Sequence, residues 1–137
     1  SLGVTTSEVE KGRLRFFAKA IGETDPVYTE ETAAKAAGYK ALPVPPTFLL
    51  CLESEGRSPQ AIVEDIMGFD LGRILHAEQQ FTYHRMAFAG DVLTFETRIV
   101  DVYEKKGGAL QFVVQETRVT NQDGEHIADL RSSLVQR

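Results

Sequence analysis

The sequence has a single cysteine, Cys51, and no hydrophobic run long enough to cross a bilayer. One cysteine excludes an internal disulfide and a cysteine-based zinc cluster, and it is typical of the reducing cytoplasm. A membrane-spanning helix needs roughly 20 consecutive apolar residues, and the N-terminal stretch lacks the basic and then apolar order of a signal peptide. We therefore expect a soluble cytoplasmic protein, with Cys51 buried as a small hydrophobe in an apolar helix.

The chain also lacks a concentrated excess of positive charge. Its formal net charge is -5 over 137 residues, whereas nucleic-acid-binding proteins usually carry clustered Lys and Arg. Hydrophobic residues make up 42% and charged residues 26%, which is an ordinary balance for a folded domain. We expect residues 1–137 to form a single domain, with neither nucleic acid nor a membrane as a partner.

Helical patterns occupy the N-terminal third of the chain. The apolar residues between positions 9 and 21 fall mainly on one helical face, with Thr6 or Ser7 as the N-cap and Gly22 as the C-terminal stop. A second short helix is expected over residues 29–37, beginning with an N-cap threonine. The two helices thus flank one polar turn.

A proline-rich lead and then the most apolar stretch of the chain follow. Pro45 or Pro46 is expected to begin a buried helix over about residues 47–54. This helix is apolar almost all round, which is typical of a helix wrapped by other elements. Residues 55–72 are rich in glycine, and we expect a connecting loop there, with at most one helical turn near residues 61–67.

From residue 73 onward the hydrophobic period changes toward two, which is the mark of strands with one buried face. The expected strands cover residues 74–84, 92–103, 109–120 and 127–135. Tight turns between them favour antiparallel pairing of consecutive strands. Helices followed by an antiparallel meander predict an α+β domain whose sheet wraps around the apolar helix. This is the hot-dog fold, and its exposed sheet edges are expected to pair between two such domains.

Three segments resemble one known family. The run Phe17–Ala34 is similar in spacing to the hydratase motif of MaoC-like (R)-specific enoyl hydratases and dehydratases: a glycine, an aspartate, Asn-Pro, a small aliphatic residue and a histidine. Residues 38–48 resemble that family's lead into the hot-dog helix, and residues 88–93 resemble its later strand-opening turn. The strongest likeness is to the N-terminal half of two-domain dehydratases and to non-catalytic subunits of (3R)-hydroxyacyl carrier-protein dehydratases.

The resemblance implies a carboxylate and an imidazole on one short loop, because reversible water addition to an enoyl thioester requires both proton removal and proton donation. Carried over residue by residue, it places Glu23 at the aspartate position, Asp25 at the asparagine position and Tyr28 at the histidine position. Only Gly22 and Pro26 match outright. A tyrosine, whose ordinary pKa is about 10, is a poor base at neutral pH. The predicted catalytic dyad is therefore degenerate.

Each of these loop residues also has a purely structural interpretation. Glu23 and Asp25 would cap the turn and the helix that follows, as turn carboxylates usually do. Tyr28 would be an aromatic residue packed beneath the turn, whereas its functional interpretation is a hydrogen-bonding residue that lines an acyl pocket.

The family also polarises the thioester carbonyl with a backbone N–H at the start of the central helix. Pro45 and Pro46 have no N–H, so the oxyanion role falls to the backbone amides of Thr47 and Phe48.

The substrate-binding site is expected to include Pro46, Gly90 and the basic pair His84 and Arg85 at a strand end. This pair could contact the phosphates of coenzyme A or of a carrier-protein phosphopantetheine, or it could simply be solvated.

No metal site and no cofactor are expected. His76 and His84 lie on one predicted strand, roughly 26 Å apart at about 3.3 Å per residue, and His126 lies at a separate turn.

Four functions remain open. The first is an acyl-thioester-binding subunit of a (3R)-hydroxyacyl-CoA or acyl-carrier-protein dehydratase, in which a homologous hot-dog partner performs the proton transfers. The second is an active homodimeric enoyl-CoA hydratase that uses Glu23 or Asp25 as base and Tyr28 as hydrogen-bond donor. The third is a binding module for acyl thioesters without turnover. The fourth is an acyl-CoA thioesterase, for which Glu53 and Glu55 are the only carboxylates near the central helix.

Overall fold

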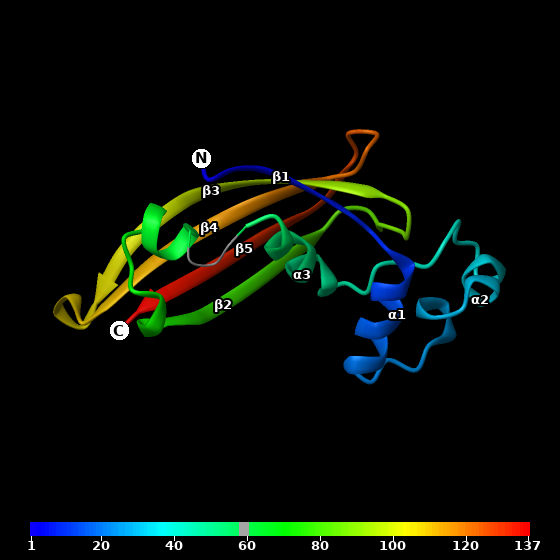
Figure 1. Ribbon diagram of the computed structural model, residues 1–137, viewed down its shortest axis with the longest axis horizontal. Coiled ribbons are helices and arrows are strands. Elements are labelled where there is room, and N and C mark those ends of the chain that lie inside the picture. Colours follow the sequence, from blue (N-terminus) through cyan, green and yellow to red (C-terminus); the bar gives the residue numbers. More distant parts are fainter. Residues whose placement is uncertain (58–60) are drawn as a thin grey trace.

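A five-stranded antiparallel sheet in the order β1-β3-β4-β5-β2 forms the body of the protein (Figure 1). The computed structural model describes residues 1–57 and 61–137. The strands are β1 (Gly3–Glu8), β2 (Ile74–Tyr83), β3 (Val92–Lys105), β4 (Leu110–Thr120) and β5 (His126–Gln136). The helices are α1 (Lys11–Ala20), α2 (Glu31–Ala36) and α3 (Phe48–Glu55). Helix α3 packs against the sheet, while α1 and α2 gather at one end of it (Figure 1).

The buried core lies between α3 and the sheet. Leu52 of α3 is 1% exposed, and Phe95 of β3 and Leu130 of β5 are equally inaccessible at 0% and 1%. Helix α1 joins the same cluster, because the Phe17 ring meets the Phe48 ring edge-on with 4.8 Å between centroids. The predicted α+β hot-dog architecture, with an antiparallel sheet around an apolar helix, is therefore confirmed.

The predicted start of the first helix is wrong. Residues Gly3–Glu8 form β1, which pairs with β3 along the sheet edge, and α1 begins only at Lys11 after Glu10. Ser7 is therefore a strand residue, and its hydroxyl hydrogen-bonds Glu55 rather than capping a helix. By pairing with the edge of β3, residues Gly3–Glu8 form backbone hydrogen bonds that stabilise them more than a short extension of α1 would. Gly22 does end the α1 segment, with φ of 75°.

The second helix also begins later than predicted. Residues Pro26–Tyr28 form a short 3-10 helix, with Asp25 as its N-cap. Helix α2 follows from Glu31 with Glu30 as its N-cap, so Thr29 serves only as the end of the 3-10 turn.

Helix α3 occupies the predicted position, but the chain does not cover it on every side. Cys51 is exposed rather than buried, and Leu50 is only half-buried. Beyond α3, residues Ala61–Ile66 form the helical turn expected in the connecting segment, with π-helical geometry. The rest of that predicted loop includes residues 58–60, which lie outside the described residues. No helix in the described ranges combines the length and apolar character of a membrane span.

The prediction that all consecutive strands pair is wrong at one connection. Strand β2 pairs with β5 and not with β3, so the segment between them crosses from one edge of the sheet toward the other. This crossing segment is held by the chain ahead of α3. Val44 N–H donates to the Ala87 carbonyl at 2.8 Å, and Ala89 N–H donates to the Leu42 carbonyl at 2.8 Å. Strands β3, β4 and β5 do follow one another as antiparallel neighbours.

Candidate functional site

The polar bend after α1 is held by its own carboxylates. Glu23 accepts hydrogen bonds from the Thr24 and Asp25 backbone N–H groups, both at 3.0 Å. Asp25 accepts from the Val27 N–H at 3.1 Å. Both acidic side chains are exposed. Their contacts match the structural interpretation, in which they stabilise the turn.

Tyr28 brings this bend to the start of α3. It lines a groove of about 230 Å³ together with Pro46 and Leu49 on one side and the chain from Tyr83 to Ala87 on the other. The groove is mostly apolar and has a few polar groups at its wall, as ligand pockets usually do. The polar bend therefore lies beside the first turn of the central helix.

The pKa of Tyr28 is raised above its ordinary value. Burial contributes most, and the negative charges of Glu23 and Asp25, followed by Tyr39, act in the same direction. A raised pKa keeps the phenol protonated at neutral pH, so Tyr28 can donate a hydrogen bond but cannot act as a base.

The two candidate oxyanion amides differ in their present contacts. Phe48 N–H already donates to the Pro45 carbonyl at 2.9 Å, which closes the turn at the entry of α3. The Thr47 N–H has no acceptor among the described residues. Of the predicted pair, Thr47 is therefore the amide that is free to meet a substrate oxygen.

The predicted basic pair lines the groove, whereas Gly90 does not. His84 and Arg85 both border the cavity beside Tyr28. Arg85 forms an ion pair with Glu125 at 3.0 Å. Gly90 has φ of 92° and donates its N–H to the Val9 carbonyl at 2.8 Å. Its role is to form the turn before β3, since a positive φ favours glycine.

A second cavity of about 290 Å³ lies farther along α3. Its lining includes Leu50 and Glu53 of α3, His76 of β2 and Gln115 of β4. The Gln115 side-chain oxygen is buried without a hydrogen-bond partner. Both cavities border α3, and each lies near a different end of this helix. Both are also lined by β2 or by the residues that directly follow it. Sequence reasoning did not find Gln115, because nothing in the local pattern of β4 distinguishes it.

The two carboxylates considered for thioester hydrolysis have different surroundings. Glu53 is partly buried and accepts a hydrogen bond from Thr117. Its pKa is raised because burial outweighs the hydrogen bond from Thr117 and the charges of Arg57 and His76. Glu55 instead contacts Ser7 and Arg13, which ties α3 to β1 and α1. Glu53 alone faces a cavity.

Replacing Glu53 by glutamine is expected to stabilise the protein at neutral pH. Because the folded-state pKa of Glu53 is raised, wild-type stability falls as pH rises from the unfolded-state pKa of about 4.3 through the folded value. Glu53→Gln keeps a hydrogen-bond acceptor for Thr117, and because glutamine does not ionise, it removes this pH-dependent loss of stability. We expect a Tm higher by roughly 2–5 °C at pH 7 and an unchanged Tm near pH 4, measured by calorimetry. Equal shifts at both pH values would contradict the burial argument.

The histidines are not arranged as the strand spacing suggested. His76 and His84 line separate cavities. His84, however, meets His126 across the β2–β5 pairing, with 4.2 Å between ring centroids. The comparison of His76 with His84 along one strand could not reveal this cross-strand pair.

These features define the class of the protein as a hot-dog domain with a groove of about 230 Å³ at the start of its central helix. The chain belongs to the family described as FAS1-like, dehydratase domain region, whose model matches residues 1–130. This agrees with the predicted resemblance to MaoC-like dehydratases and hydratases.

Sequence relatives include proteins named UPF0336 protein. That of Thermobifida fusca is 36% identical over 130 residues, which span 95% of this chain and 84% of the relative. That of Streptomyces coelicolor is 34% identical over 130 residues, with 95% and 85% covered.

Solved structures agree with the family. The (3R)-hydroxyacyl-ACP dehydratase complex HadBC from Mycobacterium tuberculosis superposes with a TM-score of 0.80 at 29% identity, over 97% of this chain and 94% of that chain. The R-hydratase PhaJ1 from Pseudomonas aeruginosa has a TM-score of 0.73 at 22% identity, over 98% and 78%. The second likeness concerns the fold alone.

Proposed function

We propose that this chain is an acyl-thioester-binding subunit of a (3R)-hydroxyacyl thioester dehydratase. In this proposal a homologous hot-dog partner supplies the aspartate and histidine for proton transfer. The observation that carries it is Tyr28, which stands at the imidazole position of the motif, borders the groove and stays protonated. A bend that lacks the motif imidazole can help to bind an acyl thioester but cannot itself remove a proton from it.

The two cavities suggest how the ligand lies. The thioester would occupy the groove near Tyr28, where the free Thr47 amide and the α3 dipole favour a partial negative charge on its oxygen. The acyl chain would extend along α3 toward the cavity lined by Leu50. His84 and Arg85 would face the phosphate-bearing carrier, either coenzyme A or an acyl carrier protein.

A partner subunit also suits the sheet. Strand β2 is an edge strand whose outer backbone groups have no pairing strand within the described chain. Its Leu75 and Tyr83 are 47% and 48% exposed. Such an edge can be completed by the edge of a second hot-dog domain, in a homodimer or a heterodimer. The HadBC relative is itself a complex.

The test is hydration of a short trans-2-enoyl-CoA, followed by loss of the enoyl thioester absorbance. The purified chain is expected to show little activity alone. Co-expression with a homologous subunit that carries the complete hydratase motif is expected to raise activity by at least about 100-fold over the chain alone. The same partner without its motif histidine is the matched control. High activity of the chain alone would favour the homodimeric hydratase, and binding without any gain on mixing would favour a module that does not turn over its ligand.

Thioester hydrolysis is the second candidate, and it is favoured only by Glu53, a partly buried carboxylate that faces a cavity beside α3. If the Glu53→Gln variant hydrolyses acyl-CoA at the wild-type rate, Glu53 is not the catalytic carboxylate of a thioesterase. Free thiol release, measured with a chromogenic disulfide, is the assay.

A further inference from the structure

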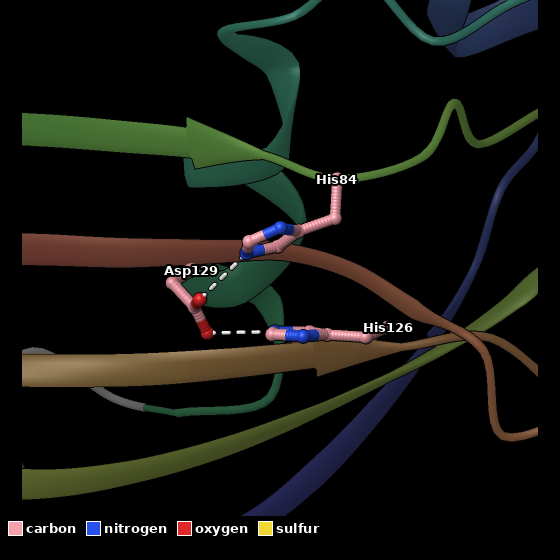
Figure 2. Close-up of side chains that lie close together, drawn as sticks. All are labelled: His84, His126 and Asp129. Atoms are coloured by element: carbon pink, nitrogen blue, oxygen red, sulfur yellow. Dashed lines mark hydrogen bonds and ion pairs between the residues drawn. The ribbon is translucent and has the colours of Figure 1, made fainter.

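Three side chains converge where β2 ends and β5 begins. His84 directly follows β2, and His126 and Asp129 belong to β5. The His84 N–H donates to the Ile127 carbonyl at 2.9 Å, so the backbone fixes the end of β2 against β5. Figure 2 shows both imidazole rings directed at the Asp129 carboxylate, one from each strand segment.

The contacts within this cluster are short and well matched. His84 Nε2 lies 2.8 Å from Asp129 Oδ2, and His126 Nε2 lies 2.8 Å from Asp129 Oδ1. The potential ligand atoms of the three side chains all lie within 4.8 Å of one another. Each imidazole therefore presents the same nitrogen, Nε2, to one shared point.

The chemistry of the cluster suits a divalent transition-metal ion. Two neutral imidazoles and one carboxylate are ligands that Zn²⁺ and its neighbours in the first transition row prefer. One cation between the three groups would replace the protons that now bridge each ring to Asp129.

The cluster is accessible to solvent. The side chains of His84, His126 and Asp129 are 39%, 31% and 45% exposed, so water can reach a metal bound between them. The nearby cation Arg85 is already paired with Glu125 at 3.0 Å, which reduces its repulsion of a metal. Imidazole ligands disfavour Mg²⁺ and Ca²⁺, which prefer oxygen.

We propose that His84, His126 and Asp129 form a three-ligand binding site for a divalent transition-metal ion, with Zn²⁺ as the preferred occupant and water at the open position. Because His84 also borders the groove beside Tyr28, a bound ion would tie the groove wall to β5. This inference does not depend on the proposed dehydratase role.

The experiment is calorimetric titration of the metal-free, untagged protein with Zn²⁺, together with Co²⁺ titration followed by visible absorption. One ion per chain is expected, with a Tm that rises as the metal concentration exceeds Kd. His84→Gln and His126→Gln are each expected to weaken binding at least tenfold, and Asp129→Asn similarly. Mg²⁺ is expected not to bind.

His76→Gln is the matched control, because the chain has 3 histidines and this one lies outside the cluster. It is expected to leave the Zn²⁺ affinity unchanged. Circular dichroism checks that each variant is folded, and the single replacements at two different histidines provide independent tests. The proposal is overturned if folded wild-type protein shows no saturable Zn²⁺ binding below millimolar concentration, or if His76→Gln weakens binding as much as His126→Gln does.

Discussion

Restoring the motif at the bend is expected to give the isolated chain measurable enoyl-thioester hydratase activity. In the combined variant Glu23→Asp, Asp25→Asn, Tyr28→His, an imidazole replaces the protonated phenol at the groove wall. General acid–base catalysis by a positioned side chain contributes about 10²–10⁴-fold. We therefore expect hydration of a short enoyl-CoA to rise by at least about 100-fold over the wild-type chain.

Two controls separate this gain from a general change in the loop. The pair Glu23→Asp, Asp25→Asn without the histidine should remain as inactive as wild type, because the bend still lacks the motif imidazole. Tyr28→Phe should also show no gain, since it removes a hydrogen-bond donor and adds no base. If the combined variant folds and binds the acyl-CoA but gains no activity, the groove at the start of α3 does not hold the thioester as proposed.

Local sequence patterns predicted where the strands lie along the chain better than they predicted the order of the strands in the sheet. The strands that became β3, β4 and β5 were predicted because turn residues and alternation are local signals. Strand β1 was missed, because its six residues show little more than β-branched character and its partner β3 begins only at Val92. The β2–β3 connection was misread as a hairpin, because the contacts that pin it come from Leu42 and Val44, far away in the sequence.

The candidate site divides in the same way. The bend with Tyr28 and the start of α3 could be predicted to meet, because the family motif carries that long-range information. The pairing of His84 with His126 and Asp129 could not, since it depends on the β2–β5 register, which a wrong strand order conceals. The exposure of Cys51 was missed for a related reason. An apolar helix was assumed to be covered all round by this chain, whereas the chain covers only part of it.

Leu52 and Leu50 provide a direct test of how α3 is covered. Leu52 is 1% exposed within the core, and Leu52→Ala is expected to lower the free energy of unfolding by about 2–5 kcal/mol, through lost burial and the cavity left behind. Leu50 is half-buried at the edge of the 290 Å³ cavity, so Leu50→Ala is expected to cost less than half as much. Urea denaturation at one fixed protein concentration measures both, because any association would also contribute to stability.

Ligand binding should show the reverse order. If the acyl chain lies along α3 as proposed, Leu50→Ala removes part of its contact surface and should weaken binding of a long-chain acyl-CoA more than that of a short-chain one. Leu52 faces the sheet, so Leu52→Ala should change binding little under conditions where the variant stays folded. Equal losses of stability for the two variants would mean that a partner covers the outer side of α3 in solution. Equal effects on long and short acyl chains would instead place the acyl chain away from this cavity.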